Sequence, residues 1–171
     1  MTHISRVTIN TIFDKIRERI SEYCSANSVL ETGEIEVYES YFGGKRVKGK
    51  RGRGASGKTP VFGMLKRGDK VYTQIVNNCT ISGLIPIIEE FTDKASVIFS
   101  VGFKSYDGIV DYGYKHHFRV IHSKNEFAVG TNHINGIENF CGQCKVRLSR
   151  FRGMNEGTFY LHIKRMQVQI Q

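Results

Sequence analysis

The sequence contains no tryptophan and only two prolines and four cysteines in 171 residues. A chain of this length can build its core without disulfides, so we interpret the cysteines as reduced intracellular thiols. Long apolar runs are also absent, and none approaches the roughly 18 residues that a membrane-spanning helix requires. The N-terminus lacks the charged and apolar regions of a secretory signal. These absences favour one intracellular domain without a membrane partner.

Acidic residues are scarce beside basic ones: 16 Asp and Glu against 25 Lys and Arg give a net charge of +9. A surface of this charge attracts polyanions through counterion release, so nucleic acid is the first candidate partner. Segment 43–59 has six glycines, no acid and seven basic residues: Lys45, Arg46, Lys48, Lys50, Arg51, Arg53 and Lys58. We expect a mobile loop there that contacts phosphates, a solvated surface being the alternative.

Hydrophobic periodicity predicts an α/β protein with a mixed sheet. The expected elements are a helix over 7–24, a strand over 35–42, two strands within 60–76, a helix over 80–92, a strand over 96–103, a short helix or turn, a strand beginning at 116, a helix over 133–153 and a further helix from 154 onward. Three antiparallel strands followed by alternating helix and strand is an order that resembles the ribonuclease H-like fold.

The chain divides, on this interpretation, into an N-terminal segment, 1–32, and a main domain, 33–171. The helix within the first segment has an apolar stripe and a charged outer face. It is either a remnant of a DNA-reading module or a helix that packs on the domain that follows. The sequence leaves both alternatives open.

Three short motifs carry little weight. The segment 52–59, "GRGASGKT", matches the phosphate-binding pattern G-x-x-x-x-G-K-[ST], but that pattern works only before a helix, and a strand is expected here. Cys141 and Cys144 form a C-x-x-C without a second ligand pair, so we interpret them as apolar core residues. His116 and His117 are expected to point to opposite faces of a strand, so at most one of them faces a cleft.

Four stretches carry more specific information: "EVYESYFGGKR", "IFSVGFKSYDG", "YKHHFRVIHSK" and "NHINGIENFCGQCKVRLSRFRG". Together they resemble the catalytic domain of insertion-sequence DDE transposases, in the ISXO2-like group related to the eukaryotic Merlin elements. The resemblance covers residues 33 to about 163. It implies double-stranded DNA as partner, a place in the cell on DNA (cytoplasm or nucleoid, or nucleus in a eukaryote), and a homo-oligomer.

The resemblance also implies a catalytic site, from which this sequence departs. Relatives use two strand aspartates and a helix acid to hold two Mg²⁺ or Mn²⁺ ions, but Tyr38 and Val101 occupy the aspartate positions. A phenol is mostly neutral at pH 7 and valine has no donor atom, so only Asn135 and Glu138 remain as ligands. We therefore expect no metal cofactor in this protein and loss of DNA cleavage.

Three hypotheses follow from these residues. The first is a DNA-binding domain that no longer cuts, with phosphate contacts from segment 45–58 and from one face of the last long helix: Lys145, Arg147, Arg150 and Arg152. The second is an active metal-dependent transposase or nuclease with a relocated site at Glu36, Asn135 and Glu138. The third is a remnant that folds poorly and binds nothing.

Overall fold

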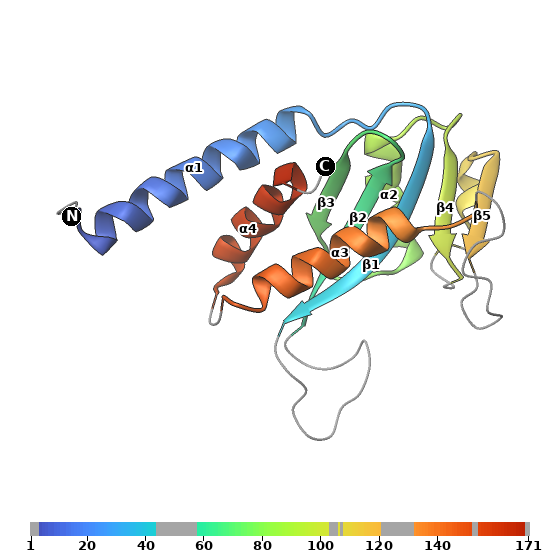
Figure 1. The fold of residues 1–171 in the computed structure, drawn as a ribbon. Helices are drawn as coiled ribbons and strands as arrows, with labels where there is room; N and C mark the ends of the chain where they lie inside the picture. The colour runs from blue at the N-terminus through green and yellow to red at the C-terminus, as the bar shows by residue number, and fades with distance from the viewer. Residues whose placement is uncertain are drawn as a thin grey trace, which may run out of the picture.

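The structure is a computed structural model that describes residues 4–43, 58–102, 106, 108–120, 132–151 and 154–169. Its elements follow the expected order (Figure 1). They are α1 (Arg6–Ala26), β1 (Glu34–Gly43), β2 (Lys58–Lys66), β3 (Val71–Ile75), α2 (Ile81–Phe91), β4 (Val97–Val101), the 3-10 helix η2 (Ile109–Tyr112), β5 (His116–Val120), α3 (Asn135–Leu148) and α4 (Glu156–Gln169).

The strands form one sheet in the order β3-β2-β1-β4-β5. β1, β2 and β3 pair antiparallel, and β4 and β5 continue the sheet parallel to β1. β1 is therefore the central strand, and its Ile35 and Val37 are fully buried. This mixed sheet with flanking helices confirms the predicted α/β class and is consistent with a ribonuclease H-like fold.

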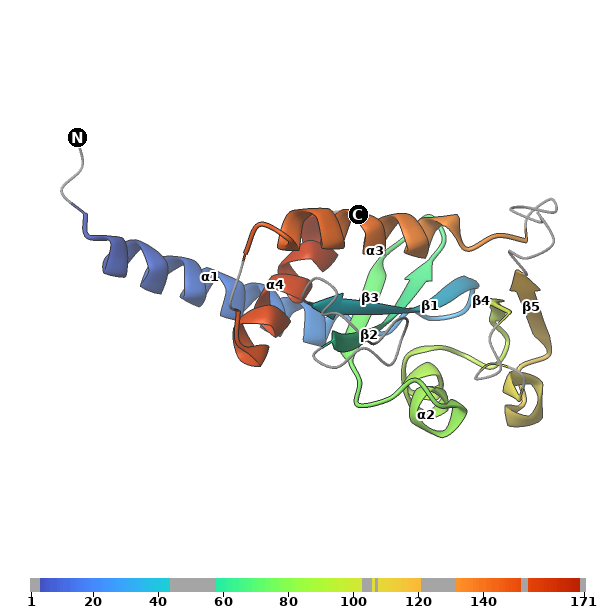
Figure 2. The same ribbon diagram turned by 90° about the horizontal axis from the view of Figure 1, so that it is seen from below.

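Helices cover both faces of the sheet, with α3 on one side and α2 on the other (Figure 2). Because side chains alternate along a strand, β1 presents Glu36, Tyr38 and Ser40 to the α3 face. The backbone N–H of Ile137 in α3 donates to Glu36 across this layer at 2.9 Å. On the opposite face, the Tyr106 hydroxyl donates to Glu39 at 2.5 Å. The central strand thus places polar groups under both layers.

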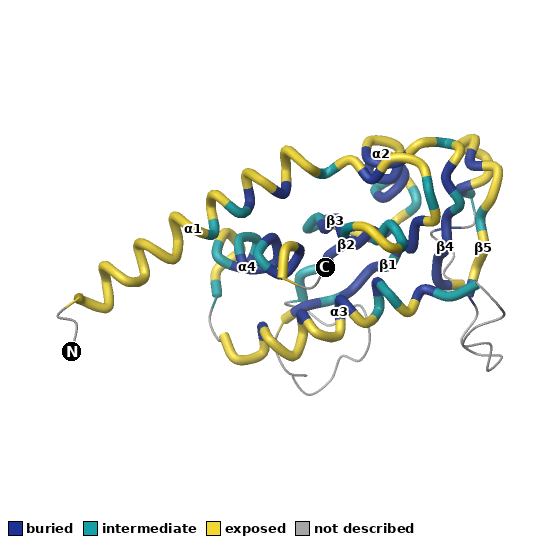
Figure 3. The backbone as a smooth tube through the Cα atoms, turned by 45° about the horizontal axis from the view of Figure 1, so that its top comes forward, coloured by how far each residue is buried: buried dark blue, intermediate teal, exposed yellow. Residues whose placement is uncertain are grey.

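The helix α1 packs against α4. Ser21 and Cys24 are the buried residues of α1, and they bond to Tyr160 and to the backbone of Lys164. The first half extends beyond the sheet (Figure 3), and Ile9, Ile12, Phe13 and Ile16 are exposed there. In the described part of the chain, no helix is long and apolar enough to cross a membrane.

Two sequence-based boundaries were wrong. The helix expected over 133–153 begins at Asn135 and ends at Leu148, because Ser149 and Arg150 form a turn. The strand expected from residue 60 begins at Lys58, which pairs with Gly43 of β1 and thereby lies on the sheet, not in a loop. Pro86 lies inside α2 without ending that helix.

Candidate active site

The two strand positions singled out by the sequence lie side by side in the sheet. Val37 of β1 pairs with Ser100 of β4, so Tyr38 and Val101 occupy the next rung of two parallel strands. Paired residues on parallel strands point to the same face, which here is the face that α3 covers. Val101 is buried and Tyr38 is half-buried. The sheet thus holds a phenol and a hydrocarbon next to each other at this point.

The first turns of α3 lie over the same part of the sheet. Gly63 pairs with Tyr38, and a Cβ atom at Gly63 would lie 2.9 Å from Ile137 Cδ1 of α3. A glycine at this position lets the helix approach β1 and β2 closely. Asn135 and Glu138 belong to these turns, Asn135 exposed and Glu138 half-buried. The structure therefore brings the two strand positions and the helix bearing Glu138 into one region.

Glu36 lies on the same face of the sheet, and its side chain binds the first turn of α3. Its side chain is 1% exposed, and Oε2 accepts the Ile137 backbone N–H at 2.9 Å. Oε1 accepts from Arg67 Nε at 2.9 Å and lies 3.3 Å from His133 Nδ1. A carboxylate at a helix N-terminus satisfies a backbone N–H group that lacks a partner within the helix and interacts favourably with the helix dipole. Glu36 therefore acts as a cap for α3.

Arg67 completes this arrangement from the turn between β2 and β3. Its guanidinium donates to Glu34 at 2.8 Å and to the His133 carbonyl oxygen at 2.6 Å, and it lies 3.9 Å from the centre of the Phe99 ring. The sequence analysis did not single out this arginine, which lies between the two strands predicted within 60–76. Its partners come from β1, β4 and the segment before α3, so local sequence carried no signal for them.

The residues present do not fit the two-metal centre of the resembled enzymes. Such a centre needs several oxygen ligands, chiefly carboxylates, around both ions. Tyr38 and Val101 supply no carboxylate, and the carboxylate oxygens of Glu36 already accept hydrogen bonds from Arg67 and from the backbone of Ile137. Across the residues that the structure describes, no group of three or more His, Cys, Asp or Glu side chains is placed to hold a metal ion.

Cys141 and Cys144 lie on the core face of α3, as predicted. Both thiols are free and buried. Burial raises the pKa of each to about 12, and for Cys141 the nearby positive charge of Lys145 offsets part of the rise. Thiols that stay protonated at neutral pH are poor metal ligands and poor nucleophiles.

The predicted phosphate-binding residues are only partly described. Lys45, Arg46, Lys48, Lys50, Arg51, Arg53 and Arg152 lie outside the described residues. Lys58 begins β2 at the edge of this segment, and it lines the same cavity as Lys145 of α3. Thr59 continues the strand, so the end of the "GKT" match does not open a helix as a phosphate-binding loop would.

The basic residues of the last long helix do not share one face, which corrects the prediction. Lys145 extends over the Phe42 ring, with Nζ 5.7 Å from its centre. Arg147 lies two positions on, which is roughly 200° around a helix, and it donates to Gln169 of α4 at 3.2 Å. Arg150 follows the end of α3 in a turn. Among the described members of this set, Lys145 lines the cavity together with Lys58.

Comparison with known proteins matches most of the chain to one family. The model of the family described as "ISXO2-like transposase domain" matches residues 31–166. An "Uncharacterized transposase-like protein" of Haemophilus influenzae is 40% identical over 95 residues, which cover 56% of this chain and 76% of that protein. No solved structure matches the chain.

Proposed function

The chain belongs to the ISXO2-like transposase family, and we propose that it binds double-stranded DNA without cutting it. Membership makes DNA transposition the reaction class and DNA the partner. The proposed loss of cleavage rests on Tyr38 and Val101, which lie side by side on β1 and β4. Neither residue places a carboxylate beside the helix that bears Glu138. Without those ligands the site lacks the negative charge that two divalent ions need.

DNA binding draws on a separate set of observations. The net charge of +9 is concentrated in segment 45–58, which contains no acidic residue. Lys58 at the end of this segment lies near Lys145, so cations from β2 and α3 meet on one part of the surface. Interactions of this kind neutralise phosphates and supply affinity with little sequence preference.

Binding is tested by fluorescence anisotropy of a labelled duplex over a range of salt concentrations. We expect affinity to fall linearly with salt on logarithmic axes. Lys58→Glu with Lys145→Glu should lower both the affinity and the slope, the slope by about one for each phosphate that the protein no longer neutralises. Lys70→Glu with Lys115→Glu is the matched control, since it makes the same charge change at two lysines outside the cavity that Lys58 and Lys145 line. Equal reductions in both proteins would contradict the proposed surface.

Cleavage is tested on supercoiled plasmid with Mg²⁺ or Mn²⁺. We expect no nicking above a protein-free control. Nicking that disappears in Glu138→Ala would instead establish the active enzyme with Glu36, Asn135 and Glu138 as its site. A protein that unfolds readily and binds no duplex would be the remnant that the sequence left open.

Cellular position and assembly follow from the same proposal. A DNA-binding protein of this family acts inside the cell on DNA, and self-association into a homo-oligomer is expected from its relatives. Sedimentation of the protein with and without duplex measures that association directly.

A further inference from the structure

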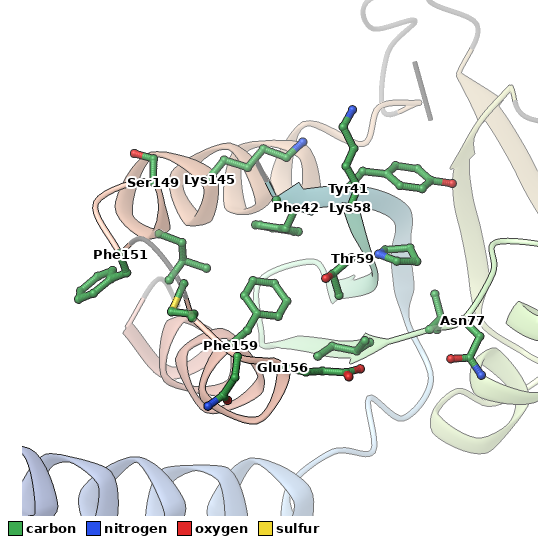
Figure 4. Close-up of a pocket in the computed structure, with 17 residues that line it drawn as sticks. Tyr41, Phe42, Lys58, Thr59, Asn77, Lys145, Ser149, Phe151, Glu156 and Phe159 are labelled. Atoms are coloured by element: carbon green, nitrogen blue, oxygen red, sulfur yellow. The ribbon is translucent and has the colours of Figure 1, made fainter. Parts of the chain in front are cut away.

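A cavity of about 750 Å³ opens at one end of the sheet (Figure 4), and neither Tyr38 nor Val101 is among the residues that line it. Its walls come from the last residues of β1, the first residues of β2, the end of β3, the end of α3 and the start of α4. This volume is in the range of pockets that hold small organic ligands. The sequence analysis gave no indication of the cavity, because its walls are far apart along the chain.

The chemistry of the cavity changes from one end to the other. Figure 4 shows the amino groups of Lys58 and Lys145 on one side, and Glu156 on the opposite side. The Phe42 and Phe159 rings lie between them and form an apolar part of the wall; both are largely buried and contact each other, with centres 5.5 Å apart, so no ligand fits between the two rings. A ligand that fits all three regions has an anionic group at one end, a flat ring in the middle and N–H donors at the other end.

A nucleotide has these three parts in this order. Its phosphate matches the two lysines, its base can pack against the apolar wall, and exocyclic amino groups on the base can donate to a carboxylate. A simple anion does not need the aromatic rings and would be repelled by Glu156. A purely apolar ligand would displace water from the lysines and Glu156 without offering them hydrogen bonds in return.

We propose that this cavity binds one unpaired nucleotide of a DNA strand, with its phosphate at Lys58 and Lys145 and its base lying between the apolar wall that Phe42 and Phe159 form and the carboxylate of Glu156. The inference rests on the proposed DNA binding and makes it more specific. Because the two lysines also belong to the proposed duplex surface, a strand that leaves a duplex end can enter the cavity without leaving those cations. The protein therefore prefers DNA with an unpaired end over a fully paired duplex.

The test compares two labelled DNAs of the same sequence, one blunt and one with a short unpaired overhang, by fluorescence anisotropy at one salt concentration. We expect the overhang DNA to bind about tenfold tighter, because the unpaired base gains contacts in the cavity that a blunt end does not make. A free deoxynucleoside monophosphate added in excess should abolish this preference, and it should also weaken blunt-duplex binding, because its phosphate occupies Lys58 and Lys145. A monophosphate that binds more tightly than the overhang would overturn the assignment to a strand.

A cavity-filling variant, Thr59→Trp, tests the location. Thr59 lines the cavity at the start of β2, and we expect the variant to lose the overhang preference while blunt-duplex affinity stays the same. Met154→Trp fills the cavity from the other wall and should do likewise, which guards against misfolding of either variant; thermal unfolding checks both. Phe118→Ala is the control, because this exposed phenylalanine lies on β5, outside the cavity.

The outcomes separate the two proposals. Equal affinity for blunt and overhang DNA in the unmodified protein, or a preference that survives both filling variants, overturns the cavity proposal and leaves duplex binding standing. Tight binding of the overhang DNA without any blunt-duplex binding supports the cavity and contradicts the proposed function. Failure to bind either DNA overturns both.

Discussion

At the residue scale, buried charges hold the domain together where a metal centre would otherwise be expected. Glu36 and Arg67 form a nearly dry ion pair that also fixes the start of α3. Removing one partner of such a pair is costly because the other remains buried without compensation. Glu36 and Arg67 therefore position α3, and this role accounts for their burial without a role in catalysis.

The first prediction concerns Glu36→Gln. We expect it to lower the free energy of unfolding by about 2–3 kcal/mol, because hydrogen bonds to a charged group are removed inside the protein. Glu34→Gln also removes a partner of Arg67, but Glu34 is half-exposed, so the cost should stay under about 1 kcal/mol. Urea denaturation of the three proteins measures both effects, and equal costs would mean that Glu36 does not cap α3.

The second prediction concerns Lys164, a buried lysine that donates to the Thr73 carbonyl oxygen at 2.7 Å. Burial lowers its pKa from 10.5 to about 8. Between these values the unfolded chain carries the proton and the folded protein does not, so this group makes stability rise with pH. The gain should be on the order of 2–3 kcal/mol and absent in Lys164→Met.

The measurement is the difference between the unfolding free energies of wild type and Lys164→Met over a pH series. Cys141 and Cys144 act in the opposite sense above their ordinary pKa of 9.0, because the folded protein keeps their protons. That contribution is common to both proteins and cancels in the difference. If the difference between the two unfolding free energies does not change from pH 8 to 10.5, burial does not lower the pKa of Lys164.

At the element scale, the seating of α3 on the sheet decides the geometry of the site. The helix approaches β1 and β2 at two glycine positions, Gly63 beneath it and Gly136 in its first turn. Gly142 lies on the same helix with open space around its Cβ position. Alanine substitutions at the two helix glycines therefore distinguish the effect of close packing on stability from the effect of helix propensity.

The third prediction compares Gly136→Ala with Gly142→Ala. A Cβ atom at Gly136 would lie 2.5 Å from Leu65 Cδ2 and 2.9 Å from Glu36 Oε2, so we expect a loss of about 1–3 kcal/mol. The same change at Gly142 should add about 0.5–1 kcal/mol, because alanine favours the helix and nothing obstructs it. Thermal unfolding measures both, and stabilisation by both changes would mean that α3 sits farther from the sheet.

Sequence periodicity was sufficient for the elements but not for their contacts. The alternation of β1 and the helical spacing of Ile137, Phe140, Cys141 and Cys144 predicted a strand and a helix, and the structure contains both. The Glu36–Arg67 pair and the cavity between β1 and α4 depend on residues far apart in sequence. No local pattern marks such contacts, because they form only once the sheet order brings the elements together.

At the scale of the whole molecule, the mixed sheet with its flanking helices is consistent with a ribonuclease H-like fold, and the proposal is that Tyr38 and Val101 replace two residues that cleavage would require. The sheet order places residues 38 and 101 side by side, and α3 lies over them, whatever side chains they carry. A fold of this kind can persist when its function changes, since the core and the site depend on different residues. A positively charged surface then leaves DNA binding as the activity that this proposal retains.

The most direct test restores both carboxylates. We expect Tyr38→Asp with Val101→Asp to bind Mn²⁺, measured by titration calorimetry, while the unmodified protein shows no such binding. Glu138→Ala in the restored background should weaken the binding, because Glu138 would complete the ligand set. Binding of Mn²⁺ by the unmodified protein with the same affinity, abolished by Glu138→Ala, would contradict the claim that this protein can no longer hold its metal ions.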